Sequence, residues 1–412
     1  ASPMGSNSAT NNVGKAFIEA YSKEFPDDGV KVLDISAAGA LPAFTAARAQ
    51  SKFKLFGGDP AVVEKDEEWK ATQQLIDEFK AADKYVFLTP MWNFFIPYTM
   101  KLYIDHIVQP AITFGTDLKG LVTGKPAMVI RAAGGVPVGS EMDTGYAYMK
   151  AVLGFIGFTD VRLLAITGTA NPDGLPALLE EKCKEAAELA PKFSFDADAK
   201  ISEPASPAAS PKPEPATVKE GAKVLFVTAS PMGEHSATKT ASTKFLDKLK
   251  EKAKVEVTTL DLAEDGIPDF AASRVQAKFA TWGGGKDACP EAVKAEWQAS
   301  TKLMEQLQAA DVYVFAVPMW NLTIPYRMKQ WLDHVVQPHQ TFDPATNSGL
   351  LKEKRAFVVA CSGNGLIGSP VDHLTPYMKQ ILGMIGVTDV AVTAVKNAGA
   401  ADEAVAELSG LC

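Results

Sequence analysis

The spacing of apolar residues in the second half of the chain predicts strands that alternate with helices. Short apolar or alternating runs predict strands, whereas apolar positions three or four residues apart predict helices. The predicted strands are residues 223–228, 255–260, 312–317, 356–360 and 390–395. The predicted helices are residues 238–253, 291–308, 324–336 and 370–385. This alternation predicts an α/β fold with a doubly wound, parallel, five-stranded sheet in the order 2-1-3-4-5.

The chain repeats itself over the length of a whole domain. The sequence ASPMG occurs at 1–5 and again at 229–233, an offset of 228 residues. With the same offset, residues 90–114 match residues 318–342 at 16 of 25 positions. Beyond this block the offset is 229, which one residue inserted between Phe342 and Gly349 explains. The sequence therefore predicts two tandem copies of one module.

A Pro/Ala-rich segment separates the two copies. We predict a first module at residues 1–196, a linker at 197–221 and a second module at 222–412. The linker composition cannot bury a core, which favours an extended tether. Because Ala1 aligns with Ala229, the first module lacks the strand predicted at 223–228. We expect the natural chain to extend at both ends, and the compartment cannot be read from this sequence.

Composition narrows the function classes. The chain is 47% hydrophobic and 22% charged, as in soluble globular proteins, with a net charge of −8. No apolar run approaches the roughly 20 residues that span a membrane. No cluster of Lys and Arg predicts a nucleic-acid surface. The four cysteines lie far apart, which argues against zinc and against a disulfide scaffold and fits a reducing compartment.

Three loops of each module follow the first, third and fourth predicted strands, and parallel strands bring such loops to one edge of the sheet. The first loop reads SPMGSNSAT from Ser2 and SPMGEHSAT from Ser230. Hydroxyls and free amides at a helix N-terminus can bind a phosphate. The alternative is an ordinary loop in which Ser and Thr cap the helix.

The second loop reads PMWN in both copies, from Pro90 and from Pro318. An indole offers a flat apolar surface, and an Asn side chain offers both a donor and an acceptor to the edge of a heterocycle. The alternative is a Trp that fills the end of the sheet and an Asn that caps the next helix. Because this block is the best-preserved segment between the two copies, we favour a binding function.

The third loop reads AAGG from Ala132 and CSGNG from Cys361. Glycines let the backbone approach a planar ligand, and a tight turn would explain them equally well. Two histidines, His106 and His334, lie beside aspartates in the helices that follow the second loop. We interpret them as structural hydrogen-bonding residues. No G-x-S-x-G sequence or Ser-His-Asp spacing supports a hydrolase.

These loops, in this order, resemble the FMN-dependent NADH-azoreductase branch of the flavodoxin-like NAD(P)H:quinone oxidoreductase family. The resemblance covers both modules almost end to end and is closest at residues 90–101, 120–124 and 153–160. By resemblance, the phosphate of FMN is held by serines, here Ser2, Ser6, Ser8, Ser230 and Ser236. The segment along the isoalloxazine ring maps onto Met91, Trp92, Asn93, Phe94, Met319, Trp320, Asn321 and Leu322.

The third family loop, Ser-Arg-Gly-Gly, departs from its pattern here. It maps onto Ala132, Ala133, Gly134 and Gly135, and onto Cys361, Ser362, Gly363 and Asn364. The first copy has therefore lost both family side chains. In the second copy Glu234 stands where the first has Ser6, and a carboxylate aimed at a phosphate would repel it.

The resemblance implies an FMN-dependent enzyme that takes hydride from NADH or NADPH and reduces quinones or azo compounds with ping-pong kinetics. Family members are homodimers with flavin sites at the interface, so a tandem chain implies an intrachain pseudo-dimer. Phe114 and Phe342 could then line the substrate pocket. The alternatives are a flavodoxin-like structural or regulatory subunit with partly decayed flavin sites and an electron carrier of the flavodoxin type.

Overall fold

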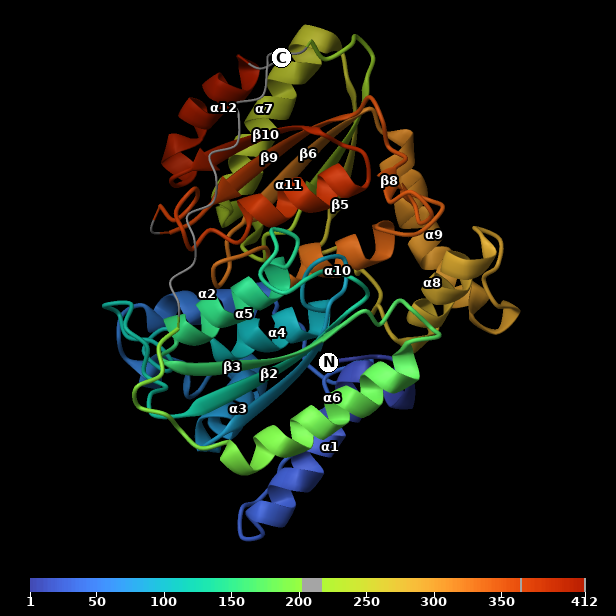
Figure 1. Cartoon of the computed structure of the whole chain (residues 1–412). Coiled ribbons are helices and arrows are strands. Elements are labelled where there is room, and N and C mark those ends of the chain that lie inside the picture. The colour runs from blue at the N-terminus through green and yellow to red at the C-terminus, as the bar shows by residue number, and fades with distance from the viewer. Residues whose placement is uncertain (202–216, 364, 411–412) are drawn as a thin grey trace. The chain divides into compact units, whose positions relative to one another are not determined.

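Five strands of the second copy pair into one parallel sheet (Figure 1). The order β10-β9-β6-β4-β5 is the predicted order 2-1-3-4-5 read from the other edge. The strands are β4 (Lys223–Thr228), β5 (Glu256–Asp261), β6 (Val312–Pro318), β9 (Arg355–Cys361) and β10 (Asp389–Val395). The predicted fold class is thereby confirmed for this copy.

The computed structural model describes residues 1–201, 217–363 and 365–410. The chain divides into two compact units, Ala1–Pro204 and Ala205–Cys412. The division falls inside the predicted linker, of which residues 202–216 lie outside the described part, so the module boundaries stay a prediction. No helix in the described ranges is long and apolar enough to cross a membrane.

Helices cover both faces of the sheet in the second unit (Figure 1). They are α7 (Ala237–Ala253), α8 (Ala272–Gly284), α9 (Lys294–Ala309), α10 (Tyr326–Val335), α11 (Thr375–Met384) and α12 (Ala401–Ser409). A core of apolar side chains joins α7 and α12 to the sheet, with Phe245 and Phe357 at its centre, 5.0 Å apart. The small strands β7 (Phe342–Asp343) and β8 (Ser348–Gly349) form a hairpin after α10.

The first unit has a sheet of three strands, where the sequence predicts four. They are β1 (Tyr85–Pro90), β2 (Pro126–Ala133) and β3 (Asp160–Thr167), paired in the order β1-β2-β3. The residues equivalent to β5 do not form a strand, and Val32 among them is 79% exposed. In the second unit β5 pairs with β4 alone. A segment without the equivalent of β4 therefore has no backbone partner for its hydrogen bonds.

The helices of the first unit repeat those of the second. They are α1 (Ala9–Glu24), α2 (Ala46–Leu55), α3 (Glu67–Ala81), α4 (Tyr98–Ile107), α5 (Thr144–Phe155) and α6 (Leu175–Leu189). Short 3-10 turns lie at η1 (Gly5–Asn7), η2 (Pro60–Val63), η3 (Ala190–Lys192), η4 (Gly233–His235), η5 (Glu291–Val293) and η6 (Ala398–Ala400). The core between α1, α6 and the sheet includes Phe17 and Phe193, 5.5 Å apart.

Helices α2 and α8 are not predicted from the apolar spacing, because charged residues occupy their buried faces. In α8 both Arg274 and Lys278 are buried, and the Nζ of Lys278 donates to the carbonyl of Val336 at 2.9 Å. In α2 the Nζ of Lys52 donates in the same way to Val108 at 2.7 Å. A pattern that counts only apolar residues does not detect such a helix.

Candidate functional site

Backbone hydrogen bonds join the three predicted loops at the carboxyl edge of each sheet. In the second unit the N–H of Ala229 donates to Ala316 at 3.1 Å, which ties the first loop to β6. The N–H of Met319 donates to Cys361 at 2.7 Å, and this contact ties the second loop to the third. Met91 donates to Ala132 at 2.7 Å in the first unit. The structure thus brings together the loops that the sequence places at one edge.

The first loop ends in a capped helix N-terminus. The Oγ of Ser8 accepts from the N–H of Asn11 at 3.2 Å and lies 2.9 Å from the Thr10 hydroxyl. Ser236 does the same for the N–H of Lys239, also at 3.2 Å. The capping interpretation is therefore confirmed for these two hydroxyls. Direct contacts of Ser8 and Ser236 with a phosphate stay a prediction.

The other loop serines occupy different environments. Ser2 and Ser230 are buried, and the Oγ of Ser230 accepts from the N–H of Met232 at 3.3 Å. Ser6 is exposed, and its carbonyl accepts from the side chain of Asn12 at 3.2 Å. Among the loop serines, Ser6 therefore has the hydroxyl most open to a ligand from solvent.

Free backbone amides at this helix end fit a phosphate. Within the described residues, the N–H groups of Ala9 and Thr10 make no hydrogen bond, and neither do those of Ala237 and Thr238. A helix leaves its first N–H groups without internal acceptors, and the helix dipole adds positive potential there. Each unit therefore presents free N–H groups at the end of the helix that follows the first loop, and phosphate binding there stays a prediction.

The second loop is a strained turn in both units. The central residues have left-handed backbones, with φ of 49° at Asn93, 63° at Phe94, 49° at Asn321 and 70° at Leu322. Reciprocal bonds close the first turn, from Trp92 N–H to Phe95 at 2.8 Å and from Phe95 N–H to Trp92 at 3.0 Å. Two successive positive φ values define a type I′ turn. Strain of this kind clusters at ligand sites.

The alternative role of the Asn as a helix cap is wrong. The residues that precede α4 and α10 are Pro97 and Pro325, four residues after each Asn. The Trp side chains do fill the sheet end, since Trp92 and Trp320 are only 8% and 7% exposed. Stacking of these indoles on a ring stays a prediction, and their burial leaves little area for it. Met91, Met319 and the turn residues Asn93, Phe94 and Asn321 are partly exposed, whereas Leu322 is buried.

Substitutions at Asn93 should show whether FMN binding requires the turn geometry or the amide side chain. Asn93→Gly keeps a residue that adopts positive φ easily, whereas Asn93→Val places a β-branched residue there at an expected cost of about 1–2 kcal/mol. If the amide itself contacts FMN, both variants should weaken FMN binding by roughly tenfold or more. If only the turn geometry is needed, only the Val variant should do so. Flavin fluorescence titration and thermal melts measure both effects, and Asn321 provides the matched position.

The third loop leaves space beside the turn. Gly134, Gly135 and Gly363 do not have positive φ, so a tight turn does not require them, whereas Gly365 has a φ of 66°, as the turn interpretation expects. A Cβ added to Gly135 or Gly363 would meet no atom within 4 Å, whereas one at Gly134 would lie 3.2 Å from Ala170. The backbone at Gly135 and Gly363 is therefore open to a planar ligand. Ser362 is buried, with its Oγ accepting from Leu366 at 2.6 Å, and Asn364 lies outside the described residues.

A buried arginine next to this loop escapes sequence reasoning. The Nε of Arg131 lies 2.9 Å from the carboxylate of Asp143, and both side chains are almost fully buried. Its Nη2 approaches the Sδ of Met91 at 3.9 Å. The second unit has Ala360 at this position, so Asp372 lacks the arginine and accepts from three backbone N–H groups. An arginine inside the apolar run at 126–133 is the one signal that the sequence offers.

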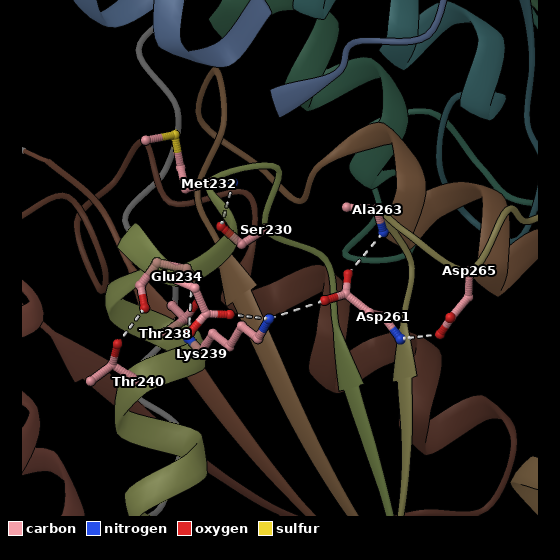
Figure 2. Close-up of polar contacts among 10 residues, drawn as sticks. Ser230, Met232, Glu234, Thr238, Lys239, Thr240, Asp261, Ala263 and Asp265 are labelled. Carbon is pink, nitrogen blue, oxygen red and sulfur yellow. Dashed lines mark hydrogen bonds and ion pairs between the residues drawn. The ribbon is translucent and has the colours of Figure 1, made fainter. Parts of the chain in front are cut away.

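A lysine in the first turn of α7, just after the first loop of the second unit, was also missed. The Nζ of Lys239 lies 3.1 Å from Glu234 and 3.4 Å from Asp261 (Figure 2). The carboxylate of Glu234 is therefore paired with a cation beside the proposed phosphate position. This pairing revises the expectation that Glu234 simply repels a phosphate.

The histidines are structural, as interpreted from the sequence. His106 and His334 are buried, and burial lowers the pKa of each to about 4. Each ring bonds a hydroxyl and a carbonyl, which are Thr72 and Pro42 for His106 and Ser300 and Pro268 for His334. Neither ring is placed to exchange protons with a substrate.

The two predicted pocket phenylalanines are enclosed. Phe114 is 3% exposed and packs near Phe56 and Phe155, and Phe342 is 0% exposed beside Trp282. Their burial gives no support to a substrate pocket, which stays a prediction. Among the described residues, no group of three His, Cys, Asp or Glu could hold a metal ion.

Comparison with known proteins places these loops in a family. A family model described as a flavodoxin-like fold matches residues 1–190 and 222–409. The chain is 40% identical over 202 residues to an FMN-dependent NADH:quinone oxidoreductase of Nitratidesulfovibrio vulgaris, covering 47% of this chain and 96% of that protein. It is 37% identical over 191 residues to FMN-dependent NADH:quinone oxidoreductase 2 of Bacillus cereus, covering 44% and 90%.

A solved structure is similar to part of the chain. It is an FMN-dependent NADH-azoreductase of Bacillus anthracis in complex with FMN, 22% identical, with a TM-score of 0.40, covering 46% of this chain and 99% of that one. The two matched segments correspond to the two copies read from the sequence. The chain therefore belongs to the flavodoxin-like family of FMN-dependent NADH:quinone oxidoreductases, present here as two tandem copies.

Proposed function

We propose that the chain is an FMN-dependent NAD(P)H oxidoreductase that reduces quinones or azo compounds by two-electron transfer. The single observation that carries this function is the 40% identity to an FMN-dependent NADH:quinone oxidoreductase over 96% of its length. The second and third loops agree with it. They form a strained turn and an open glycine backbone at the edge where doubly wound sheets bind ligands.

The residues present fit FMN. The amides of Ala9 and Thr10, with the exposed Ser6, would hold the phosphate in the first unit. The turn at Asn93 and Phe94 would lie along the ring, with Gly135 leaving room for close approach. When bound, FMN supplies the redox chemistry, accepting hydride from NADH or NADPH and passing two electrons to the acceptor. The protein positions the ring and sets its electrostatic surroundings.

The buried His106 and His334 are not placed as general acids, since burial lowers the pKa of each to about 4. The cation of Arg131 is neutralised by Asp143. Solvent can protonate the product, so catalysis would depend on binding and orientation. We expect ping-pong kinetics, because donor and acceptor would use the same face of the site in turn.

The test is a count of flavin per chain. Purified protein, reconstituted with excess FMN and desalted, should retain two FMN per chain, measured from the absorption of flavin released by denaturation. Addition of NADH or NADPH under argon should bleach the flavin, and a quinone should restore its colour. A chain that takes up no FMN would contradict the proposed function and favour a structural or regulatory subunit instead.

We further propose that the two units form a pseudo-dimer within one chain. The family model matches two segments, one in each copy, and a tether raises the effective concentration of one unit for the other. Small-angle X-ray scattering of the monomeric chain should then give the radius of gyration of one compact body of 412 residues. Scattering from two separate beads on a tether would contradict the pseudo-dimer.

A further inference from the structure

The first loops of the two units, with the helix turn that follows each, differ in charge at two positions. In the second unit Lys239 lies in the first turn of α7, with its ammonium between the carboxylates of Glu234 and Asp261 (Figure 2). In the first unit the equivalent residues of Lys239 and Glu234 are Asn11 and Ser6. The side chain of Asn11 donates to the carbonyl of Gly5 at 3.1 Å. The first loop of the first unit is therefore held by neutral groups, and the equivalent loop of the second unit is held by ions.

The carboxylate after the second predicted strand is common to both units. Asp261 accepts from the N–H of Ala263 at 3.1 Å, and Asp34 accepts from the N–H of Ser36 at 2.8 Å. The Ser36 hydroxyl adds a second bond to Asp34 at 2.6 Å, whereas Lys239 makes the additional contact to Asp261. The ammonium and the Glu234 carboxylate are thus the features special to the second unit.

A cation in this position needs an anion. The N-terminal end of a helix carries positive potential, and the free amides of Ala237 and Thr238 lie in the same turn as Lys239. Lysine there is unfavourable unless negative charge is close. Asp261, with 17% of its side chain exposed, is a fixed partner, but Glu234 is 91% exposed. Ion pairs so exposed contribute little and exchange easily, so the ammonium can take another anion.

We propose that Lys239 is a phosphate ligand specific to the second unit, and that Glu234 occupies it until FMN displaces the carboxylate. This inference rests on the proposed function. A phosphate monoester carries close to two negative charges near pH 7, so it attracts the ammonium more strongly than one carboxylate does. Charge-assisted bonds to phosphate oxygens are stronger than bonds from neutral donors. Glu234 therefore lowers, and Lys239 raises, the affinity of this unit for FMN.

The test compares FMN with riboflavin, which lacks the phosphate. Apo full-length chain is titrated with each flavin, following the quenching of flavin fluorescence. Lys239→Asn should weaken FMN binding to the second unit by about tenfold and leave riboflavin binding unchanged. Glu234→Ser should tighten FMN binding several-fold, again without a change for riboflavin. Because the substitutions lie in one unit, only one of the two binding phases should move.

The first unit supplies the matched controls. Asn11→Lys should tighten FMN binding to the first unit, and adding Ser6→Glu to that variant should remove part of the gain. A double-mutant cycle between positions 234 and 239 should show coupling, since the gain from Glu234→Ser requires the ammonium. An unchanged FMN affinity in Lys239→Asn, or equal losses for FMN and riboflavin, overturns the inference. Absence of FMN binding in both units overturns the proposed function together with it.

Discussion

Asp105→Asn should lower the free energy of unfolding of the first unit by about 3–5 kcal/mol, because it leaves buried positive charge without a counter-ion. The carboxylate of Asp105 forms a hydrogen-bonded ion pair with Lys101, and their side chains are 3% and 0% exposed. Lys52 is a second buried lysine in the field of Asp105, and burial lowers its pKa to about 7, so it is only partly charged near neutral pH. One carboxylate therefore faces two buried lysines.

The measurement is urea unfolding followed by circular dichroism. Asp333→Asn is the matched variant, because Lys329, Asp333 and Lys278 repeat the arrangement in the second unit. Replacement of all three residues, Lys52→Met, Lys101→Met and Asp105→Leu, should lose much less stability than Asp105→Asn, since it leaves no member of the cluster buried without its counter-ion. Glu19→Gln, which breaks the exposed pair of Lys15 and Glu19, should change stability by less than about 0.5 kcal/mol. A loss of similar size in Glu19→Gln and Asp105→Asn would contradict the role of burial.

This cluster explains much of the identity between the copies. Beyond the PMWN turn, the repeated block contains Asp105, His106, Gln109 and Thr113, all buried. The Nε2 of Gln109 donates to the carbonyl of Asp105 at 2.7 Å, and the Thr113 hydroxyl donates to Ile107 at 2.8 Å. Gln337 and Thr341 make the same bonds in the second unit. The segment from Lys101 onward is therefore preserved by packing and buried hydrogen bonds.

The preserved block extends from the PMWN loop, for which we favoured ligand binding, to the histidines that we interpreted as structural. The structure divides it into the strained turn at Asn93 and Phe94, which packing does not explain, and a helix anchored by buried polar groups. Sequence alone cannot make this division, because a buried aspartate and an exposed ligand-binding aspartate are the same letter. Burial depends on the partner residues, here Lys52 and Lys101, which come from different helices.

Fold and site were predictable to different depths. The five strands of the second unit were predictable, because each central strand is a continuous apolar run. The absence of the second strand from the first unit was not predictable, since residues 29–34 have the composition of a strand and lack only a neighbouring strand to pair with. The meeting of three loops followed from parallel topology. The roles of Arg131 and Lys239 could not be predicted, because their pairing with Asp143 and Asp261 is a property of the folded chain.

Each unit should lose stability as the pH falls from about 6.5 to 4, and the second unit should lose more. In the first unit the Nε2 of His106 donates to the carbonyl of Pro42 at 2.8 Å, so its Nδ1 accepts from Thr72 at 2.9 Å. This ring must stay neutral, and burial lowers its pKa to about 4. The unfolded chain, with a histidine pKa near 6.5, binds a proton that the folded unit does not.

The size follows from the shift in pKa. A change from about 6.5 to about 4 corresponds to about 3 kcal/mol per histidine, fully lost only near pH 4. The first unit has His106 in this state, whereas the second has both His334 and His373, each with a pKa lowered by burial to about 4. Acid unfolding of the second unit should therefore be steeper.

Buried carboxylates also respond to acid. The contribution of each histidine is therefore the difference in the pH dependence of the free energy of unfolding between the wild type and His106→Gln or His334→Gln. Those variants should be less stable at pH 7 but less dependent on pH between 6.5 and 4, and an unchanged slope would show that the rings are charged in the folded chain.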